Sequence, residues 1–493
     1  MSLDTFRPMK TPTFSMRTMA RSLAALGAGR TSSETLAATV REFLLATLRT
    51  FPWRVTFQDW TGARYDTGGD ATHWSRHEAL EIRLNEGAGR DLLALDGMRF
   101  LERFLDREVE LTGNIYLLPE LRNYVKLTLT PWRILQNRLR NLVFENPSRA
   151  RASVKSHYDI SEEALFYLDR VYRSYSCAMF DEPDVLTRRS DLEVGRGEPD
   201  TYDSLEKAQW RKFAHAADYL APRPDETVLD VGCGYPGFLM VLMDRHPGAK
   251  VVGWTHSANQ VREGRGMLAG YDPSRYELNE GDYREDTRQY DHIHSTGMIS
   301  HVGPPGPNSG LLNYVREVRR RIRTGGRYVH HALMIAHTGS RLFDSIGPAF
   351  NRRYVWPGFY WYTLGQHVTA LEENGFQVMR AIDLTPHYAK TTWMWHERMC
   401  ADRDRFVRHA GESTYRAWQL FLAGITGSFL IRQTHCYRLL CQATDTERPA
   451  VDRSDPTRGI SARMPIDLPP VRGGAGVRPR ATCGPHLRIS SAR

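Results

Sequence analysis

The stretch VLDVGCGYPGF, residues 228–238, decides the fold of this chain. It opens with a short apolar run that is typical of a buried strand, and three glycines follow at the spacing G-x-G-x-x-G (Gly232, Gly234 and Gly237). Glycines at such a turn let a ligand approach the backbone, and the start of the next helix favours polar or anionic groups. The stretch therefore predicts a strand, a ligand-binding loop and a helix within an α/β sheet.

The same glycine spacing occurs in dinucleotide-binding proteins, and a tight turn without a ligand is a further alternative. Two features argue against NAD. Asp230 stands two residues before the first glycine, and the next predicted strand, VVGWTHSANQ (251–260), ends without the Asp or Glu that would bind a ribose diol.

Strand and helix signals alternate on both sides of this stretch, from residue 149 to residue 444. Further strands are predicted in AKVVGWTH (249–256), YDHIHSTGM (290–298) and GRYVHHALMI (326–335), with helical segments between them. Such alternation is typical of a doubly wound, Rossmann-like α/β domain. FLAGITGSFLI (421–431) is too short to span a membrane, and we expect it to be a core helix.

Three other segments surround this domain. Residues 36–148 are predicted to form a small α+β N-terminal domain, with two strands in 53–69, a third strand in 77–84 and mostly helix from residue 96 onward. Residues 1–35 are predicted to be a disordered leader. Residues 445–493 carry nine arginines against five acids, with many prolines and glycines, and are predicted to be a disordered tail.

The chain of 493 residues has a net charge of +9 and a pI of about 9.2, which suggests an acidic partner. A basic tail on an ordinary enzyme explains the charge equally well. No basic segment with interleaved aromatic residues resembles a nucleic-acid module, so we expect an anionic membrane surface and no nucleic acid. Homodimer formation is left open.

The six cysteines show no CxxC pair and no zinc-ligand spacing, and no run approaches 18 apolar residues. We therefore expect reduced thiols, no metal and no transmembrane helix. These features together predict a cytoplasmic protein that associates with the membrane from its surface.

Further motifs occur along the chain in a fixed order. They are SHYDISEEALFYL (156–168), SYSCAMF (174–180), SLEKAQWRK (204–212), GDYRE (281–285), FNRRYVWPG (350–358) and HYAKTTWMWHERM (387–399). With these motifs the chain resembles the cyclopropane-fatty-acyl-phospholipid synthases and mycolic acid cyclopropane synthases, which are S-adenosylmethionine-dependent methyltransferases. The resemblance covers about residues 53 to 442, and SYSCAMF and HYAKTTWMW are its most specific parts.

The resemblance implies a set of residues for S-adenosylmethionine. Tyr175 and Ser176 are expected to contact the cofactor beside the reacting centre, and Gly232 and Gly234 are expected to line its methionine part. Thr255 and Gln260 are expected at the ribose, and Tyr283 next to the adenine.

The resemblance also implies a bicarbonate ion, held by two backbone groups and three side chains. The backbone groups belong to Cys177 and Leu333, and the side chains are those of Ser300, His331 and Tyr388. Side chains alternate along a strand, so only one histidine of the HH pair in 326–335 can face the site, and the alignment of motifs selects the second.

Ser300 departs from the family pattern, because GMISHVG (297–303) stands where the family has GMFEHVG or close to it. A hydroxyl can accept a hydrogen bond from bicarbonate, but a charge-assisted bond to a carboxylate is about twice as strong. Three explanations stay open. Bicarbonate is still held, with water filling the gap; another group such as His301 is the base and the product differs; or the protein has lost activity and binds only cofactor or lipid.

The expected chemistry follows from the alkene substrate of the family. An alkene is a weak nucleophile, so a sulfonium must supply the electrophile, and methyl transfer leaves a carbocation that aromatic faces such as Tyr175 can stabilise. A base must then remove a proton before a ring can close.

We expect methyl(ene) transfer to the double bond of an unsaturated fatty-acyl lipid, giving a cyclopropane. A C-methyltransferase giving a methyl-branched or methylene lipid is the alternative, and an impaired lipid- or cofactor-binding protein is a third reading.

Overall fold

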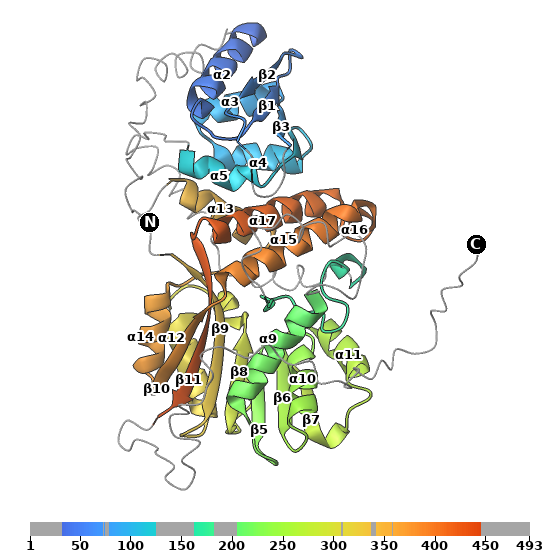
Figure 1. Cartoon of the computed structure of the whole chain (residues 1–493), viewed down its shortest axis with the longest axis vertical. Helices are drawn as coiled ribbons and strands as arrows, with labels where there is room; N and C mark the ends of the chain where they lie inside the picture. The colour runs from blue at the N-terminus through green and yellow to red at the C-terminus, as the bar shows by residue number, and fades with distance from the viewer. Residues whose placement is uncertain are drawn as a thin grey trace, which may run out of the picture.

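The computed structural model describes residues 32–71, 73, 78–124, 162–181, 205–306, 309–336, 342–356 and 358–444. Figure 1 shows an N-terminal domain at one end, an α/β domain at the other and a layer of helices between them. The predicted tail, most of the predicted leader and residues 125–148 of the predicted N-terminal domain lie outside the described residues.

The first described helix, α2 (Ser33–Leu48), begins inside the predicted leader. The Oγ of Ser32 accepts a hydrogen bond from the backbone N–H of Thr35, and this bond caps the helix. Helix α2 therefore begins three residues before residue 36, the predicted start of the N-terminal domain.

The N-terminal domain contains a four-stranded sheet in the order β2-β1-β3-β4. As predicted, β1 (Val55–Gln58) and β2 (Arg64–Thr67) form an antiparallel pair, and β3 (Leu80–Arg83) pairs parallel with β1. Strand β4 (Glu110–Gly113) was not predicted, because the helical pattern before it masks the point where the chain turns back. The remaining helices are α3 (Glu86–Ala94), α4 (Gly97–Leu105) and α5 (Leu117–Tyr124).

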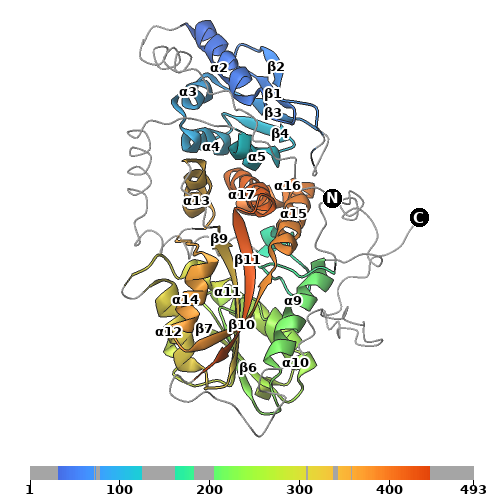
Figure 2. The same ribbon diagram turned by 60° about the vertical axis from the view of Figure 1, so that its left-hand side comes forward.

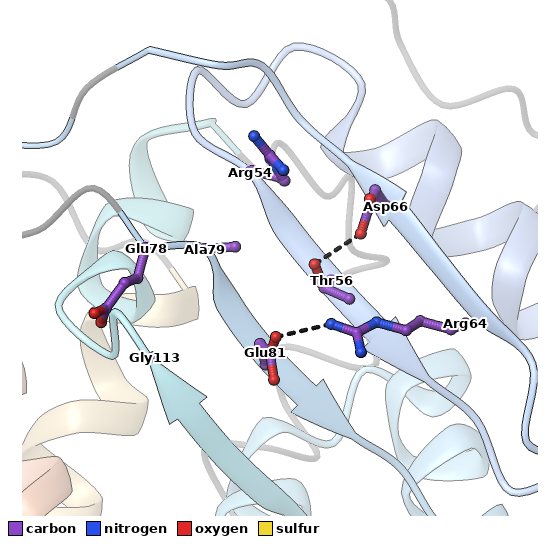
Figure 3. A pocket seen from close by; sticks show the side chains of 8 residues that line it. All are labelled: Arg54, Thr56, Arg64, Asp66, Glu78, Ala79, Glu81 and Gly113. Atoms are coloured by element: carbon purple, nitrogen blue, oxygen red, sulfur yellow. Dashed lines mark hydrogen bonds and ion pairs between the residues drawn. The ribbon is translucent and has the colours of Figure 1, made fainter.

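A hollow over this sheet is shown in Figure 3. Its polar side chains pair with one another across neighbouring strands: the Thr56 hydroxyl donates to Asp66 at 2.7 Å, and Arg64 pairs with Glu81 at 2.8 Å. These four groups satisfy one another, and their domain lies at the other end of the molecule from the α/β domain (Figure 1), so we assign no ligand site to the hollow.

The α/β domain is built on a seven-stranded sheet in the order β10-β11-β9-β8-β5-β6-β7. The four predicted strands are β5 (Thr227–Val231), β6 (Lys250–Thr255), β8 (His292–Thr296) and β9 (Arg327–Ile335), and β7 (Tyr276–Glu280) joins them in the parallel part. At the other edge, β11 (Thr434–Ala443) runs antiparallel to β9 and to β10 (Phe376–Asp383). The predicted doubly wound, Rossmann-like fold is confirmed, with an antiparallel edge that local strand signals did not reveal.

Helices cover both faces of this sheet, as Figure 2 shows. On one face lie α9 (Leu205–Leu220), α10 (Gly237–Arg245) and α11 (Ala258–Met267); on the other lie α12 (Gly310–Arg321) and α14 (Leu364–Glu372). Each face has its own apolar core, with Phe213 and Leu242 in the first and Val315 and Leu371 in the second. Burial on both faces explains why the central strands are continuous apolar runs.

The helical layer consists of α13 (Leu342–Tyr354), α15 (Thr385–Ala401), α16 (Arg403–Ala410) and α17 (Glu412–Leu430). Helix α17 contains most of the predicted core helix. Its buried Arg416 donates to the backbone oxygens of Phe104 (2.6 Å) and Val109 (2.8 Å) and pairs with Glu110 at 3.0 Å. These contacts fix the N-terminal domain against the layer, and one hydrophobic core runs through both.

Candidate active site

The carboxyl ends of β5, β6, β8 and β9 meet at the edge of the sheet that faces the helical layer. The glycine loop follows β5, and Gly232 (φ +71°) and Gly234 (φ +58°) both adopt the left-handed conformation that favours glycine. Gly237 begins α10, where a Cβ would lie 2.8 Å from the ring of Phe213. The loop therefore needs glycine for two different reasons, backbone conformation and close packing.

Two further predicted cofactor residues lie beside this loop. The Thr255 hydroxyl donates to Oε1 of Gln260 at 2.6 Å, and a Cβ on Gly234 would lie 3.9 Å from Nε2 of Gln260. Tyr283, in the 3-10 turn Tyr283–Glu285, is buried between Tyr314 and the guanidinium of Arg321, which lies 5.5 Å from the Tyr283 ring centre. The structure thus brings Gly234, Thr255 and Gln260 together, whereas the Tyr283 ring packs against the α12 side.

The segment that carries Ser176 is held by a buried lysine that we did not assign from the sequence. Nζ of Lys212 donates to the hydroxyl of Ser176 at 2.8 Å and also to that of Ser174. Burial lowers the pKa of Lys212 to about 7, although Asp169 opposes that shift. Lys212 lies in the quoted motif SLEKAQWRK, and its side chain positions the backbone next to the cofactor residues.

Tyr175 lies in a group of aromatic side chains contributed by distant parts of the chain. Its ring stacks on Trp395 of α15 at 4.9 Å and meets the edges of Trp356 and Trp418 at 5.2 and 5.8 Å. The hydroxyl of Tyr167 donates to that of Tyr175 at 3.3 Å. We call these five residues the aromatic cage, and four of them could not be assigned from local sequence patterns.

Cys177, His331 and Tyr388 come together in the buried region beside this cage. A ligand atom of Cys177, one of His331 and one of Cys436 lie within 4.8 Å of one another, and all three residues are buried. Burial, and after it the neighbouring Cys436 and Cys177, raise the pKa of the Tyr388 phenol on α15 well above its usual value. Leu333 lies directly opposite Cys436 in the β9–β11 pairing. We call Cys177, His331, Tyr388 and Cys436 the anion cluster.

The two neighbouring histidines of β9 face opposite sides of the sheet, as strand alternation requires. His330 points toward α14, where its Nε2 lies 2.8 Å from Nδ1 of His367. His331 points toward Cys436, whose Sγ lies 3.2 Å from its Nε2.

Arg438 on β11 sets the protonation of His331. It is fully buried, it pairs with His331 in the strand register, and its Nη2 donates to Nδ1 of His331 at 3.3 Å. A nitrogen that accepts a hydrogen bond carries no hydrogen, so Nε2 of His331 is the N–H donor. Burial, Arg438 and Lys212 hold the pKa of His331 well below its usual value, so the ring is neutral.

The same cluster bears on our expectation that the protein holds no metal. Two cysteines and a histidine at this spacing are ligands that zinc or copper(I) accepts. A metal-bound histidine normally donates its other ring N–H to an oxygen acceptor, whereas here that nitrogen faces a guanidinium. The electrostatics of the cluster therefore favour an anion over a cation.

Ser300 lies in the 3-10 turn Met298–His301, directly after β8. The turn is attached to β9, because the backbone N–H of Gly297 donates to the carbonyl of His331 at 3.0 Å. The Ser300 side chain is buried, and its Oγ has no hydrogen-bond partner among the described residues. His301, the alternative base, packs against the rings of Trp356 and Phe359, and burial lowers its pKa to about 4.

The fold and the glycine loop together define a class I methyltransferase. Residues 145–439, more than half of the chain, match the family described as mycolic acid cyclopropane synthetase. The chain belongs to this family, and hence to the S-adenosylmethionine-dependent methyltransferases.

Individual relatives differ in the products that their names imply. A probable fatty acid methyltransferase of Pseudomonas putida is 30% identical over 56% of this chain and 65% of its own length. A sphingolipid C9-methyltransferase of Candida albicans is 24% identical over 73% of this chain and 69% of its own length. The alignments thus span about two thirds of each relative.

Among solved structures, a mycolic acid cyclopropane synthase complexed with SAH and CTAB has the same fold, with a TM-score of 0.52. It is 24% identical and covers 59% of this chain and 97% of its own. Within the part of our chain that the structure describes, no helix is both long and apolar enough to cross a membrane.

Proposed function

We propose that this protein transfers a methyl(ene) group from S-adenosylmethionine to the double bond of an unsaturated fatty-acyl lipid and forms a cyclopropane. The observation that carries the proposal is the convergence beside the aromatic cage of Cys177, His331 and Tyr388, which come from three separate parts of the sequence. When bound, S-adenosylmethionine supplies an electrophilic methyl group.

The aromatic cage suits the positive charge that methyl transfer leaves on the acyl chain. The face of an aromatic ring attracts a cation, and the attraction grows to about 2 kcal/mol where water is excluded. Trp395 is buried and Tyr175 stacks on it, so the cage offers ring faces without a nucleophilic carboxylate. Such surroundings stabilise a carbocation and do not trap it as an ester.

The anion cluster suits bicarbonate. Nε2–H of His331 is a donor, the phenol of Tyr388 stays protonated, and the buried Oγ of Ser300 can donate or accept. The carbonyl of His331 accepts a hydrogen bond from the backbone of Gly297, at the start of the turn that carries Ser300. Backbone groups two residues apart in a strand point to the same edge of that strand. The N–H of Leu333 therefore points toward the same turn. When bound there, bicarbonate supplies a base that can leave with the proton.

A methyl-branched or methylene product is the second candidate. Two observations favour it: the neutral Ser300 replaces a carboxylate, and the two relatives described above are named as methyltransferases of fatty acids and sphingolipids. After methyl transfer, loss of a proton from a neighbouring chain carbon gives a methyl-branched alkene. A 1,2-hydride shift followed by loss of a proton from the new methyl group gives a methylene group.

One labelling experiment separates these products. Purified protein is incubated with S-adenosylmethionine carrying a CD3 group and with phospholipid vesicles that contain unsaturated chains. A cyclopropane or a methylene group keeps two of the three deuterium atoms, whereas a methyl branch formed by loss of a chain proton keeps all three. NMR of the product then distinguishes the ring from the methylene group.

A product with two deuterium atoms and ring signals is the expected result. A product with all three deuterium atoms would establish the second candidate. Absence of any labelled lipid, in protein that binds S-adenosylmethionine, would contradict both.

A further inference from the structure

A second cluster of polar groups lies where the N-terminal domain meets the helical layer, outside the aromatic cage and the anion cluster. It contains Cys400, His396 and Glu397 of α15, Tyr415 of α17 and Tyr116 just before α5. We call these five residues the Cys400 cluster. None of them is needed for the methyl transfer proposed above.

Hydrogen bonds connect the Cys400 cluster in the order Glu397, Tyr116, His396, Cys400, Tyr415. Tyr116 donates to the carboxylate of Glu397 at 3.0 Å, so its oxygen accepts from Nδ1–H of His396, 2.6 Å away. The other ring nitrogen of His396, Nε2, lies 3.5 Å from Sγ of Cys400. The hydroxyl of Tyr415 donates to the same sulfur at 3.5 Å.

This arrangement favours a thiolate beside an imidazolium. A carboxylate at one end of the chain and a sulfur at the other both stabilise a positive His396, and a second donor, Tyr415, stabilises a negative sulfur. Burial opposes both charges, but Cys400 and Glu397 together raise the pKa of His396 to about 9, and His396 with Tyr415 lowers the pKa of Cys400. Arg403 and Glu412, which pair with each other beside Tyr415, complete the charged surroundings.

Cys400 differs from the other four cysteines that the structure describes. Cys177, Cys436 and Cys441 are fully buried, and Cys233 is half-buried like Cys400 but has no histidine beside it. Burial raises the pKa of the Cys233 thiol well above the usual value. Cys400 alone among these five combines partial exposure with an imidazole and a hydroxyl donor at the sulfur.

We propose that Cys400 is a reactive thiolate and the site at which hydroperoxides oxidise this protein. The sulfur attacks the terminal oxygen of the hydroperoxide, an S–O bond forms and the O–O bond breaks. Sulfur loses two electrons to the peroxide oxygens, and the leaving alkoxide or hydroxide takes the proton of the His396 imidazolium. The products are a cysteine sulfenic acid and an alcohol, or water from hydrogen peroxide.

Oxidation has a structural consequence at this place. A sulfenic acid is neutral, so His396 loses the negative partner that holds its charge, and the bond from His396 to Tyr116 of the N-terminal domain weakens. Trp395, the residue before His396, stacks on Tyr175 in the aromatic cage. Modification of Cys400 therefore loosens a contact between the two domains next to the active site.

The first test compares alkylation rates within one protein. Full-length protein with Cys483→Ser is treated with iodoacetamide at pH 7, and peptide mass spectrometry follows Cys400 and Cys233. We expect Cys400 to react about tenfold faster or more, because the thiolate is the reactive species. His396→Gln and, separately, Tyr415→Phe should slow Cys400 and leave Cys233 unchanged. Hydrogen peroxide followed by dimedone should place the dimedone adduct on Cys400.

The proposal is overturned if Cys400 reacts no faster than Cys233, or if both variants leave its rate unchanged. Tyr415→Phe removes only one hydroxyl, so it keeps the test valid if His396→Gln does not fold. For the structural consequence, peroxide should lower the Tm of the parent protein and leave that of Cys400→Ser unchanged. Equal Tm shifts in the two proteins, or no shift in the parent, would contradict the loosened contact.

Discussion

Ser300 is neutral where the family pattern has a glutamate, so the charges around His331 come from other residues, among them Arg438. Arg438 is a fully buried cation whose Nε has no hydrogen-bond partner among the described residues, and it lies against His331. A buried cation is costly unless an anion accompanies it. If the proposed bicarbonate binds beside His331, its own charge would compensate Arg438.

The first prediction concerns Ser300→Glu. If bicarbonate is the base, the added carboxylate supplies a charge-assisted hydrogen bond worth about 1.5–3 kcal/mol. The bicarbonate concentration for half-maximal rate should then fall about tenfold or more, with the product unchanged. The measurement is turnover against bicarbonate concentration in buffer depleted of carbon dioxide.

Ser300→Gln is the matched control, because it has the length of glutamate without the charge. Tyr388→Phe should raise the bicarbonate requirement by removing one donor. Two results together would refute bicarbonate as the base: wild-type turnover that does not change when bicarbonate is depleted, and a lower turnover in Ser300→Glu than in the wild type. His301→Ala would then be expected to be the most damaging change.

At the scale of elements, the glycine loop between β5 and α10 allows ligand contact and packing to be separated. A Cβ at Gly234 would meet no protein atom closer than 3.9 Å, whereas at Gly237 it would lie 2.8 Å from Phe213 and 2.9 Å from Tyr172. Gly234→Asp should therefore abolish S-adenosylmethionine binding by steric conflict with the ligand, and cost about 1–2 kcal/mol of stability from its positive φ. Calorimetric titration with S-adenosylmethionine checks this second prediction.

Gly237→Ala is the opposite case. It should lower the free energy of unfolding by about 1–3 kcal/mol, as overpacking does, and leave the affinity of the folded protein largely intact. An unchanged affinity of Gly234→Asp for S-adenosylmethionine would show that the glycine loop is not part of the cofactor site.

The same element shows what the sequence could and could not predict. The strand–loop–helix unit, the four strands and the predicted residues Cys177, His331 and Tyr388 follow from local patterns and a family resemblance. Cys436 and Arg438 were missed, because they reach His331 through the pairing of β11 with β9, more than 100 residues apart in sequence. Strands β4, β7, β10 and β11 were not predicted; β4 and β7 lie beside helical segments, and β10 and β11 form the antiparallel edge of the sheet. Long-range register is set by tertiary packing, and no local signal encodes it.

For the whole molecule, the charge distribution leads to a third prediction, on membrane binding. Among the described residues the exposed large apolar side chains are Leu45, Val171 and Leu312, on three separate segments, so they form no evident apolar docking surface. If the net positive charge and the arginine-rich tail attract anionic lipid, binding to phosphatidylserine-containing vesicles should fall as salt is added, since exposed charges are screened over about 8 Å at physiological ionic strength. Deleting residues 446–493 should weaken binding and keep the Tm.

Neutral phosphatidylcholine vesicles are the control for that experiment. Binding that ignores salt and survives the deletion would point to an apolar surface in the N-terminal domain instead of electrostatic attraction.

Buried histidines lead to the last prediction, on stability and pH. Burial lowers the pKa of His215 and His330 to about 3 and that of His73, His301 and His387 to about 4. In the unfolded chain these groups titrate near pH 6.5, so below that pH the unfolded state binds more protons than the folded state. Stability contributed by the neutral rings is complete above pH 6.5 and is lost as the pH falls toward 4.

Each such histidine can remove about 1.4 kcal/mol per pH unit within this window. His396 opposes the trend between about pH 6.5 and pH 9, because its pKa is raised to about 9 and its contribution fades as the pH rises through that window. The free energy of unfolding from urea titration should therefore decrease by several kcal/mol between pH 7 and pH 5, with a steeper fall below pH 6. The decrease should be smaller in His73→Gln, which removes one buried titrating ring from the N-terminal domain and leaves the active site untouched. A stability that stays constant from pH 7 to pH 5 would show that these rings are not held neutral in the folded protein.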